Sequence, residues 1–175
     1  MSNSIPPVLN LEKWLVENKH LLVPPVANKQ IFTMSEDYIL MLVGGPNKRH
    51  DWHNEPYEEW FYQIKGNAHV LVQGENGLER IDIREGDMWL LPRNTWHSPQ
   101  RPEADSLGLV VERVRPEGTT EKFGWFCEEC NHQLHEVSVQ LENIETDLPL
   151  VYNAFHEDLD KRTCSECGTL HPGKG

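Results

Sequence analysis

The sequence predicts an all-β fold of the sandwich or barrel type with short helices, and two features of the chain support it. Between residue 37 and about residue 114, short apolar runs recur at near-regular spacing, and clusters of glycine, proline and asparagine separate them. Many short strands punctuated by turn signals are typical of sandwiches and barrels. The expected strands span residues 38–43, 59–65, 68–73, 80–83, 87–91 and 107–113.

A short helix is expected before these strands, over residues 11–19. Asn10 is placed to cap it, and Leu11, Trp14 and Leu15 share one helical face. The sequence Val-Pro-Pro-Val at residues 23–26 then predicts an extended turn, because a residue that precedes proline avoids the helical region.

The C-terminal third of the chain has a different character. Two Cys-x-x-Cys pairs bracket a strand-like run at residues 137–140 and a helix expected around residues 148–157. We therefore divide the chain into a β-barrel core with an N-terminal helix, residues 1–115, and a metal-tied C-terminal extension, residues 116–175.

Charge and hydropathy exclude two classes of partner. The 175-residue chain has a formal net charge of -12, which argues against a nucleic-acid surface but leaves room for a small anionic ligand beside a few local arginines. Its apolar runs are far shorter than the roughly 20 residues of a membrane helix, and the N-terminus lacks a secretory pattern. These observations predict a cytoplasmic protein whose cysteines stay reduced.

Histidine and glutamate recur at defined distances from turn residues in two segments. The first holds His53 and Glu59, and the second ends in His97. Two imidazoles and a carboxylate are the ligands typical of non-haem iron(II), which keeps open positions for substrate and dioxygen. A single histidine is more often structural, so we assign no role to His20, His69 or His156. The turn residues that flank the segments are Gly45, Gly66, Gly86, Pro92 and Asn94.

This spacing resembles the two motifs of the cupin superfamily, which implies a double-stranded β-helix, or jelly-roll, barrel. Two positions depart from the motifs. Asp51 stands where the first histidine of the first motif is expected, so the protein ligands number three rather than four. Asn94 replaces a glycine of the second motif, which is a mild change because asparagine tolerates positive φ.

A closer resemblance covers nearly the whole chain. The residues that carry it are 44–53, 58–63 and 97–104, together with residues 24–28 and the terminal cysteine pairs. They are similar to the 3-hydroxyanthranilate 3,4-dioxygenase family, in its bacterial form with a rubredoxin-like four-cysteine site. The resemblance implies that His53, Glu59 and His97 bind a catalytic iron(II).

Three charged residues fit poorly in a plain barrel. Glu112 interrupts the apolar run 107–111, while Arg49 and Arg101 each lie four residues from a candidate histidine ligand. From the residues alone, an internal arginine–glutamate pair or exposed charges on an edge strand remain alternatives. The family resemblance assigns Arg101 and Glu112 to substrate binding and Arg49 to catalysis on the dioxygen side.

The same resemblance implies further roles and the reaction itself. Glu59 also touches the substrate, and Asn28 matches a loop residue near the site. The reaction is extradiol-type ring cleavage of 3-hydroxyanthranilate by dioxygen to 2-amino-3-carboxymuconate semialdehyde, which cyclises to quinolinate. That places the enzyme in tryptophan degradation or in the supply of NAD, and the resemblance suggests a homodimer.

The four cysteines, Cys127, Cys130, Cys164 and Cys167, predict a tetrahedral metal site with a structural role. Their spacing resembles rubredoxin knuckles without the usual glycine and proline, so iron and zinc both remain open. Unrelated thiols or two redox-active pairs are the alternative interpretation. Nearby alternative ligands are His132, His135 and His171.

Two other functions are compatible with the residues alone. One is a non-catalytic cupin that senses a small aromatic acid, and the other is a cupin isomerase or decarboxylase. Oxygen consumption that depends on iron and on 3-hydroxyanthranilate separates both from the dioxygenase.

Overall fold

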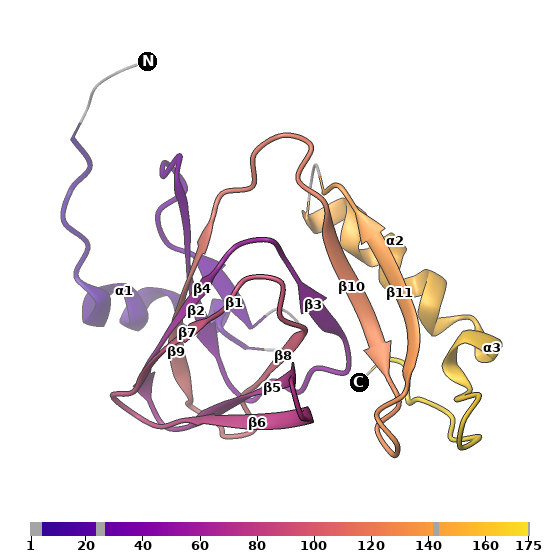
Figure 1. The fold of residues 1–175 in the computed structure, drawn as a ribbon. Helices are drawn as coiled ribbons and strands as arrows, with labels where there is room; N and C mark the ends of the chain where they lie inside the picture. Colours follow the sequence, from indigo (N-terminus) through magenta and orange to yellow (C-terminus); the bar gives the residue numbers. More distant parts are fainter. Residues whose placement is uncertain (1–4, 24–26, 142–143, 175) are drawn as a thin grey trace.

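Two antiparallel sheets form the body of the molecule (Figure 1). The computed structural model describes residues 5–23, 27–141 and 144–174, with the side chains of 144–146 left out. The first sheet has the order β1 (Asn28–Gln30), β2 (Tyr38–Gly44), β9 (Leu107–Arg113), β4 (Glu59–Lys65) and β7 (Met88–Leu91). The second has the order β11 (Gln133–Val139), β10 (Glu121–Phe126), β3 (Trp52–Asn54), β8 (His97–Gln100), β5 (Ala68–Gly74) and β6 (Gly77–Ile83).

The chain crosses repeatedly from one sheet to the other. Strands β4, β7 and β9 belong to the first sheet, whereas β5, β6, β8 and β10 belong to the second. Apolar side chains of both sheets meet in one buried core, formed by Phe61, Val70, Val72, Ile83, Leu91 and Val110. This arrangement confirms the expected all-β, cupin-type double-stranded β-helix with short helices.

All six strands expected from the sequence are present, and most differ from the prediction by a few residues at one end. The prediction missed β1, β3, β8 and β10. Strands β3 and β8 are short and carry polar residues on buried positions, so they lack the alternation of apolar and polar residues that marks a strand.

The N-terminal helix is confirmed. Helix α1 (Leu11–Asn18) begins after Asn10, whose side chain accepts a hydrogen bond from the backbone N–H of Lys13 at 3.0 Å. A 3-10 turn, η1 (Lys19–Leu21), follows. The apolar face of α1 packs on a second cluster of buried residues, Leu22, Leu42 and Leu107, and so closes one side of the first sheet. Most of the turn expected at residues 23–26 lies outside the described residues.

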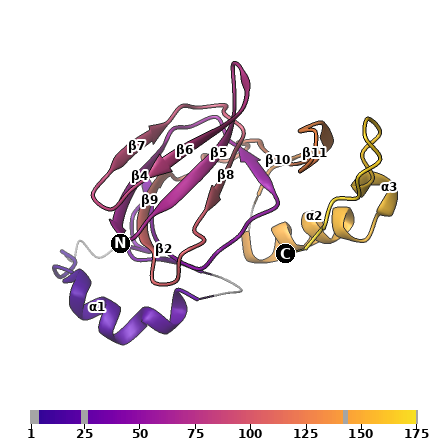
Figure 2. The same ribbon diagram turned by 90° about the horizontal axis from the view of Figure 1, so that it is seen from below.

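The C-terminal segment continues the second sheet before it forms helices. Strand β10 pairs with β3 on one side and with β11 on the other. Helix α2 (Ile144–His156), longer than expected, and α3 (Leu159–Arg162) follow β11, and Figures 1 and 2 show them beside the β10–β11 hairpin, away from α1. Of the strand-like run expected at 137–140, residues 137–139 form the end of β11, which begins earlier, at Gln133. None of the described helices is long and apolar enough to cross a membrane.

Candidate active site

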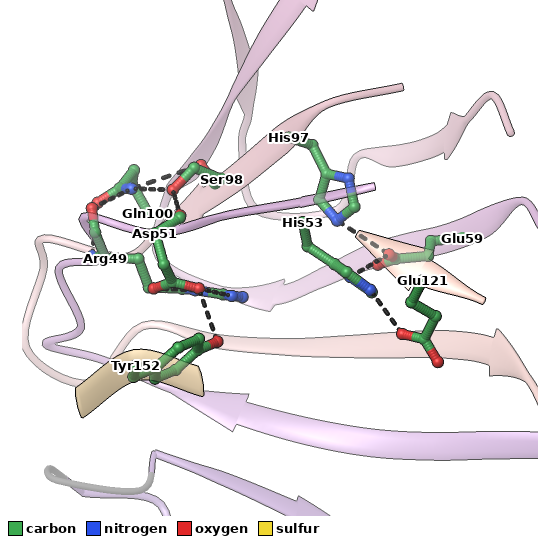
Figure 3. Close-up of polar contacts among 9 residues, drawn as sticks. All are labelled: Arg49, Asp51, His53, Glu59, His97, Ser98, Gln100, Glu121 and Tyr152. Atoms are coloured by element: carbon green, nitrogen blue, oxygen red, sulfur yellow. Dashed lines mark hydrogen bonds and ion pairs between the residues drawn. The ribbon is translucent and has the colours of Figure 1, made fainter. Parts of the chain in front are cut away.

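Three side chains from three strands converge inside the barrel (Figure 3). His53 on β3 lies opposite His97 on β8 in the second sheet, and Glu59 begins β4 in the first sheet. Glu59 Oε1 lies 2.9 Å from His97 Nε2 and 3.7 Å from His53 Nδ1. All three residues are buried, and one ligand atom of each lies within 4.8 Å of the others.

The outer nitrogen of each imidazole has its own partner. His97 Nδ1 lies 3.0 Å from the carbonyl oxygen of Thr95, and His53 Nε2 lies 2.7 Å from Glu121 Oε2. Carbonyl and carboxylate oxygens accept, so each of these nitrogens donates its hydrogen outward. In the neutral form of each ring, which is the form that binds a metal, His97 Nε2 and His53 Nδ1 are then the free ligand atoms, and both face Glu59. Glu59 Oε1 is itself buried and accepts no hydrogen bond. This donor set fits a divalent cation, which would satisfy all three lone pairs at once.

Burial changes the proton affinity of these groups in opposite directions. It lowers the pKa of His97 to about 4, so the imidazole is neutral near pH 7, which is the form that binds metals. Burial, with the charge of Glu112, raises the pKa of Glu59 to about 7. A cation between them would favour the ionised carboxylate.

Arg101, just beyond β8, is a buried cation without a counter-ion among the described residues. Its side chain is 4% exposed, and Nη1 donates a hydrogen bond of 2.7 Å to Gln63 Oε1. Its Nε has no hydrogen-bond partner, and no described carboxylate pairs with the guanidinium. Burial lowers its pKa to about 10. A guanidinium in this state is suited to a ligand carboxylate.

The space for Arg101 depends on a residue that sequence reasoning missed. A Cβ on Gly108 of β9 would lie 2.3 Å from Arg101 Nη2 and 2.8 Å from Cζ. Glycine at this position therefore lets the guanidinium lie against the strand. The signal in the sequence was a glycine inside an apolar strand, which often marks close approach of another group.

Glu112 is paired, but with a different arginine from those considered in the sequence. Arg115 Nη1 lies 2.6 Å from Glu112 Oε2, and the same guanidinium contacts Glu55 at 2.7 Å and Glu121 at 2.8 Å. The internal arginine–glutamate pair that the sequence left open thus exists, with Arg115. Burial, followed by the charges of Glu59 and Glu112, raises the pKa of Glu55 to about 9.

Arg49 is held by Asp51, the residue at the position of the missing cupin histidine. Both oxygens of Asp51 face the Arg49 guanidinium, and Tyr152 donates a hydrogen bond of 2.9 Å to Oδ2 (Figure 3). Burial would raise the pKa of Asp51, but the charge of Arg49 outweighs it and lowers the pKa to about 2. Asp51 is not grouped with His53, so the motif positions supply three candidate ligands, His53, Glu59 and His97. On the other side of the His53 ring, Glu55 and Glu121 form a second acidic group with the same histidine.

The remaining motif residues are placed as follows. Asn94, Gly66 and Gly86 adopt positive φ angles of 57°, 65° and 88°, as the turn positions of the motifs require. Asn28 is exposed at the start of β1, and no described hydrogen bond joins it to the His53 group.

The four cysteines also converge. Their sulfur atoms lie within 4.8 Å of one another, and the pairs Cys127–Cys167 and Cys130–Cys164 are 3.5 Å apart. These separations are too long for disulfides. They suit a tetrahedron whose metal–sulfur bonds of about 2.3 Å place the sulfurs roughly 3.8 Å apart.

The nearby histidines take other partners. His132 Nε2 lies 3.3 Å from Ser165 Oγ, and His171 Nδ1 accepts a hydrogen bond from Gly173. His50, the other histidine of the first motif segment, lies 2.5 Å from Glu128 and outside the His53 group.

Comparison with known proteins finds relatives along nearly the whole chain. The profile of the family described as 3-hydroxyanthranilic acid dioxygenase matches residues 1–156. The 3-hydroxyanthranilate 3,4-dioxygenase of Burkholderia cenocepacia is 48% identical over 165 residues, which cover 94% of this chain and 93% of the relative. That of Burkholderia lata is 49% identical, with 94% of each chain covered. Among solved structures, a cupin-2 domain protein from Shewanella frigidimarina has a TM-score of 0.46 at 19% identity, covering 61% of this chain and 95% of that chain.

Proposed function

Because the chain belongs to the 3-hydroxyanthranilate 3,4-dioxygenase family, we propose that His53, Glu59 and His97 hold a catalytic iron(II). The family also gives the activity. The protein is a ring-cleaving dioxygenase that converts 3-hydroxyanthranilate and dioxygen to 2-amino-3-carboxymuconate semialdehyde, the precursor of quinolinate.

One observation carries the metal assignment. One nitrogen of each imidazole and a carboxylate oxygen without a hydrogen-bond partner face one another in a buried space, and the other nitrogen of each ring already has an oxygen partner. A divalent ion would bind all three atoms at once, which accounts for the close approach of two ring nitrogens and a buried carboxylate oxygen. Iron(II) bound there would supply open positions for the substrate and dioxygen and a route for electron density between them.

The residues around the metal site are proposed to bind different parts of the substrate and dioxygen. Arg101 holds the substrate carboxylate, because it is the buried cation without a counter-ion. Glu112 and Glu59 present carboxylate oxygens to the amino and hydroxyl side of the ring. Arg49 acts on the dioxygen side, where its charge interacts with Glu59. We retain Asn28, which lies at the start of β1 rather than in a loop, as a substrate-binding residue.

The four-cysteine site is proposed as a structural metal site for iron or zinc. The metal would tie residues 116–175 into a compact extension of the 1–115 barrel. This extension contributes β10 and β11 to the second sheet. We further propose that the enzyme is a homodimer, as the resemblance suggests, and that it is cytoplasmic, as expected from the sequence.

Oxygen-electrode measurements test the metal assignment. His53→Ala, Glu59→Ala and His97→Ala should each abolish oxygen consumption with iron(II) and 3-hydroxyanthranilate, and should remove one metal equivalent while the cysteine site keeps its own. His69→Ala, a histidine outside both candidate metal sites, is the matched control and should behave as wild type. Near-normal turnover in any of the first three variants would contradict the assignment.

A further inference from the structure

The backbone and the side chain of Arg49 are held by different residues. Gln100 of β8 binds the backbone, and Asp51 binds the guanidinium. Gln100 Oε1 accepts a hydrogen bond from the Arg49 N–H at 3.1 Å, and Gln100 Nε2 donates one of 2.9 Å to the Arg49 carbonyl. Ser98 Oγ, in turn, donates a hydrogen bond of 2.8 Å to the carbonyl of Asp51. These contacts fix the main chain of residues 49–51 on β8 and leave the direction of the guanidinium to other groups.

That direction is set by Asp51. The Arg49 Nε lies 3.3 Å from Asp51 Oδ1, and Nη2 contacts Oδ2, so the two side chains form a forked pair. Burial by itself would lower the pKa of Arg49, but the charge of Asp51 and, to a smaller extent, that of Glu59 raise it. Two carboxylates therefore attract one guanidinium, and the orientation of Asp51 decides where its charge lies.

Asp51 receives its third contact from the C-terminal segment. The hydroxyl of Tyr152, on helix α2, donates a hydrogen bond of 2.9 Å to Asp51 Oδ2, and Figure 3 shows the three side chains in contact beside His53. This contact joins residues 101 positions apart in the sequence.

The ring of Tyr152 is fixed by aromatic side chains of β10. It packs edge-on to Phe123, with ring centroids 6.0 Å apart, and edge-on to Trp125 at 5.9 Å. Phe123 itself stacks on His53 at 4.7 Å, and Phe155 of α2 stacks on Trp125 at 4.2 Å. Helix α2 also lies, in the sequence, between the two cysteine pairs. Because the four sulfur atoms come together, the chain segment that contains α2 is closed at both ends.

We propose that Tyr152 is a positioning residue for Arg49, so that the cysteine-closed C-terminal segment sets the orientation of the arginine on the dioxygen side of the site. The hydroxyl keeps Asp51 turned towards Arg49, and Asp51 keeps the guanidinium from moving onto Glu59. This inference rests on the role proposed above for Arg49.

The test compares Tyr152→Phe, which removes only the hydroxyl, with Tyr38→Phe, which alters an exposed tyrosine on β2. Tyr152→Phe should raise KM for dioxygen by about three- to tenfold, a part of the effect of one hydrogen bond to a charged group, and leave KM for 3-hydroxyanthranilate nearly unchanged. In an Asp51→Asn background the same change should add little, because the two residues act in series. Tyr38→Phe should match wild type in every measurement.

A second readout needs neither iron nor turnover. In metal-free protein labelled with 15N-arginine, the Arg49 Nε–H should exchange with solvent slowly in wild type and faster in Tyr152→Phe, with assignment by loss of the signal in Arg49→Lys. Unchanged exchange in a folded Tyr152→Phe protein would overturn the inference. If Arg49→Ala leaves KM for dioxygen unchanged, the proposed role of Arg49 fails instead, and the exchange measurement still decides whether Tyr152 positions it.

Discussion

Replacing Arg101 by methionine should separate substrate recognition from stability. Methionine fills much of the same space without the charge. Losing a hydrogen bond to a charged group costs roughly 1.5–3 kcal/mol, so binding of 3-hydroxyanthranilate should weaken by about ten- to 150-fold. Anaerobic calorimetry measures this loss without turnover.

The stability of the same variant should not fall, and two opposing effects decide this. The substitution leaves Gln63 Oε1 without its 2.7 Å donor, which costs roughly 1–3 kcal/mol. It also removes a cation that is 4% exposed and lacks a counter-ion, which relieves a burial penalty of several kcal/mol. The penalty is the larger, so we expect the Tm of Arg101→Met to equal or exceed that of wild type.

Two controls isolate the carboxylate contact. 2-Aminophenol, the substrate without its carboxylate, should bind wild type and Arg101→Met with similar affinity. Arg93→Met, at an exposed arginine in the turn before β8, should leave both affinities unchanged. If Arg101→Met weakened binding of the acid and of 2-aminophenol equally, Arg101 would not be the carboxylate anchor.

Three further changes probe the surroundings of the site. Glu121→Gln removes the charged acceptor of the outer His53 N–H and should weaken iron binding about 10- to 100-fold, measured by competition with a chelator; unchanged affinity would mean that Glu121 does not tune the ligand. Gly108→Ala should displace the Arg101 guanidinium and reduce affinity for 3-hydroxyanthranilate but not for 2-aminophenol; equal loss for both would point to a general distortion of the barrel. Changing Cys127 and Cys164 to serine should remove one metal equivalent and lower the Tm while the barrel site keeps its iron, and retention of both equivalents would refute the four-cysteine site.

The sequence by itself predicted the β architecture, the helix after Asn10 and the groups that now converge, His53 with Glu59 and His97 and the four cysteines. These features rest on local information. A few neighbouring residues are enough to indicate a strand or a turn. Histidine and glutamate can likewise be recognised as candidate metal ligands by their fixed distance from turns such as that at Asn94.

Only the tertiary structure identified the groups that surround the site, and the reason is physical. Glu121, Gly108 and Tyr152 act through contacts with residues 68, 7 and 101 positions away, and their own neighbours in the sequence carry no motif. Whether a buried charge has a partner likewise depends on packing between strands. Sequence analysis singled out Arg101 and passed over Arg115, and it could not tell which of them is paired. Among the described residues, Arg101 is buried without a counter-ion, whereas Arg115 contacts three carboxylates.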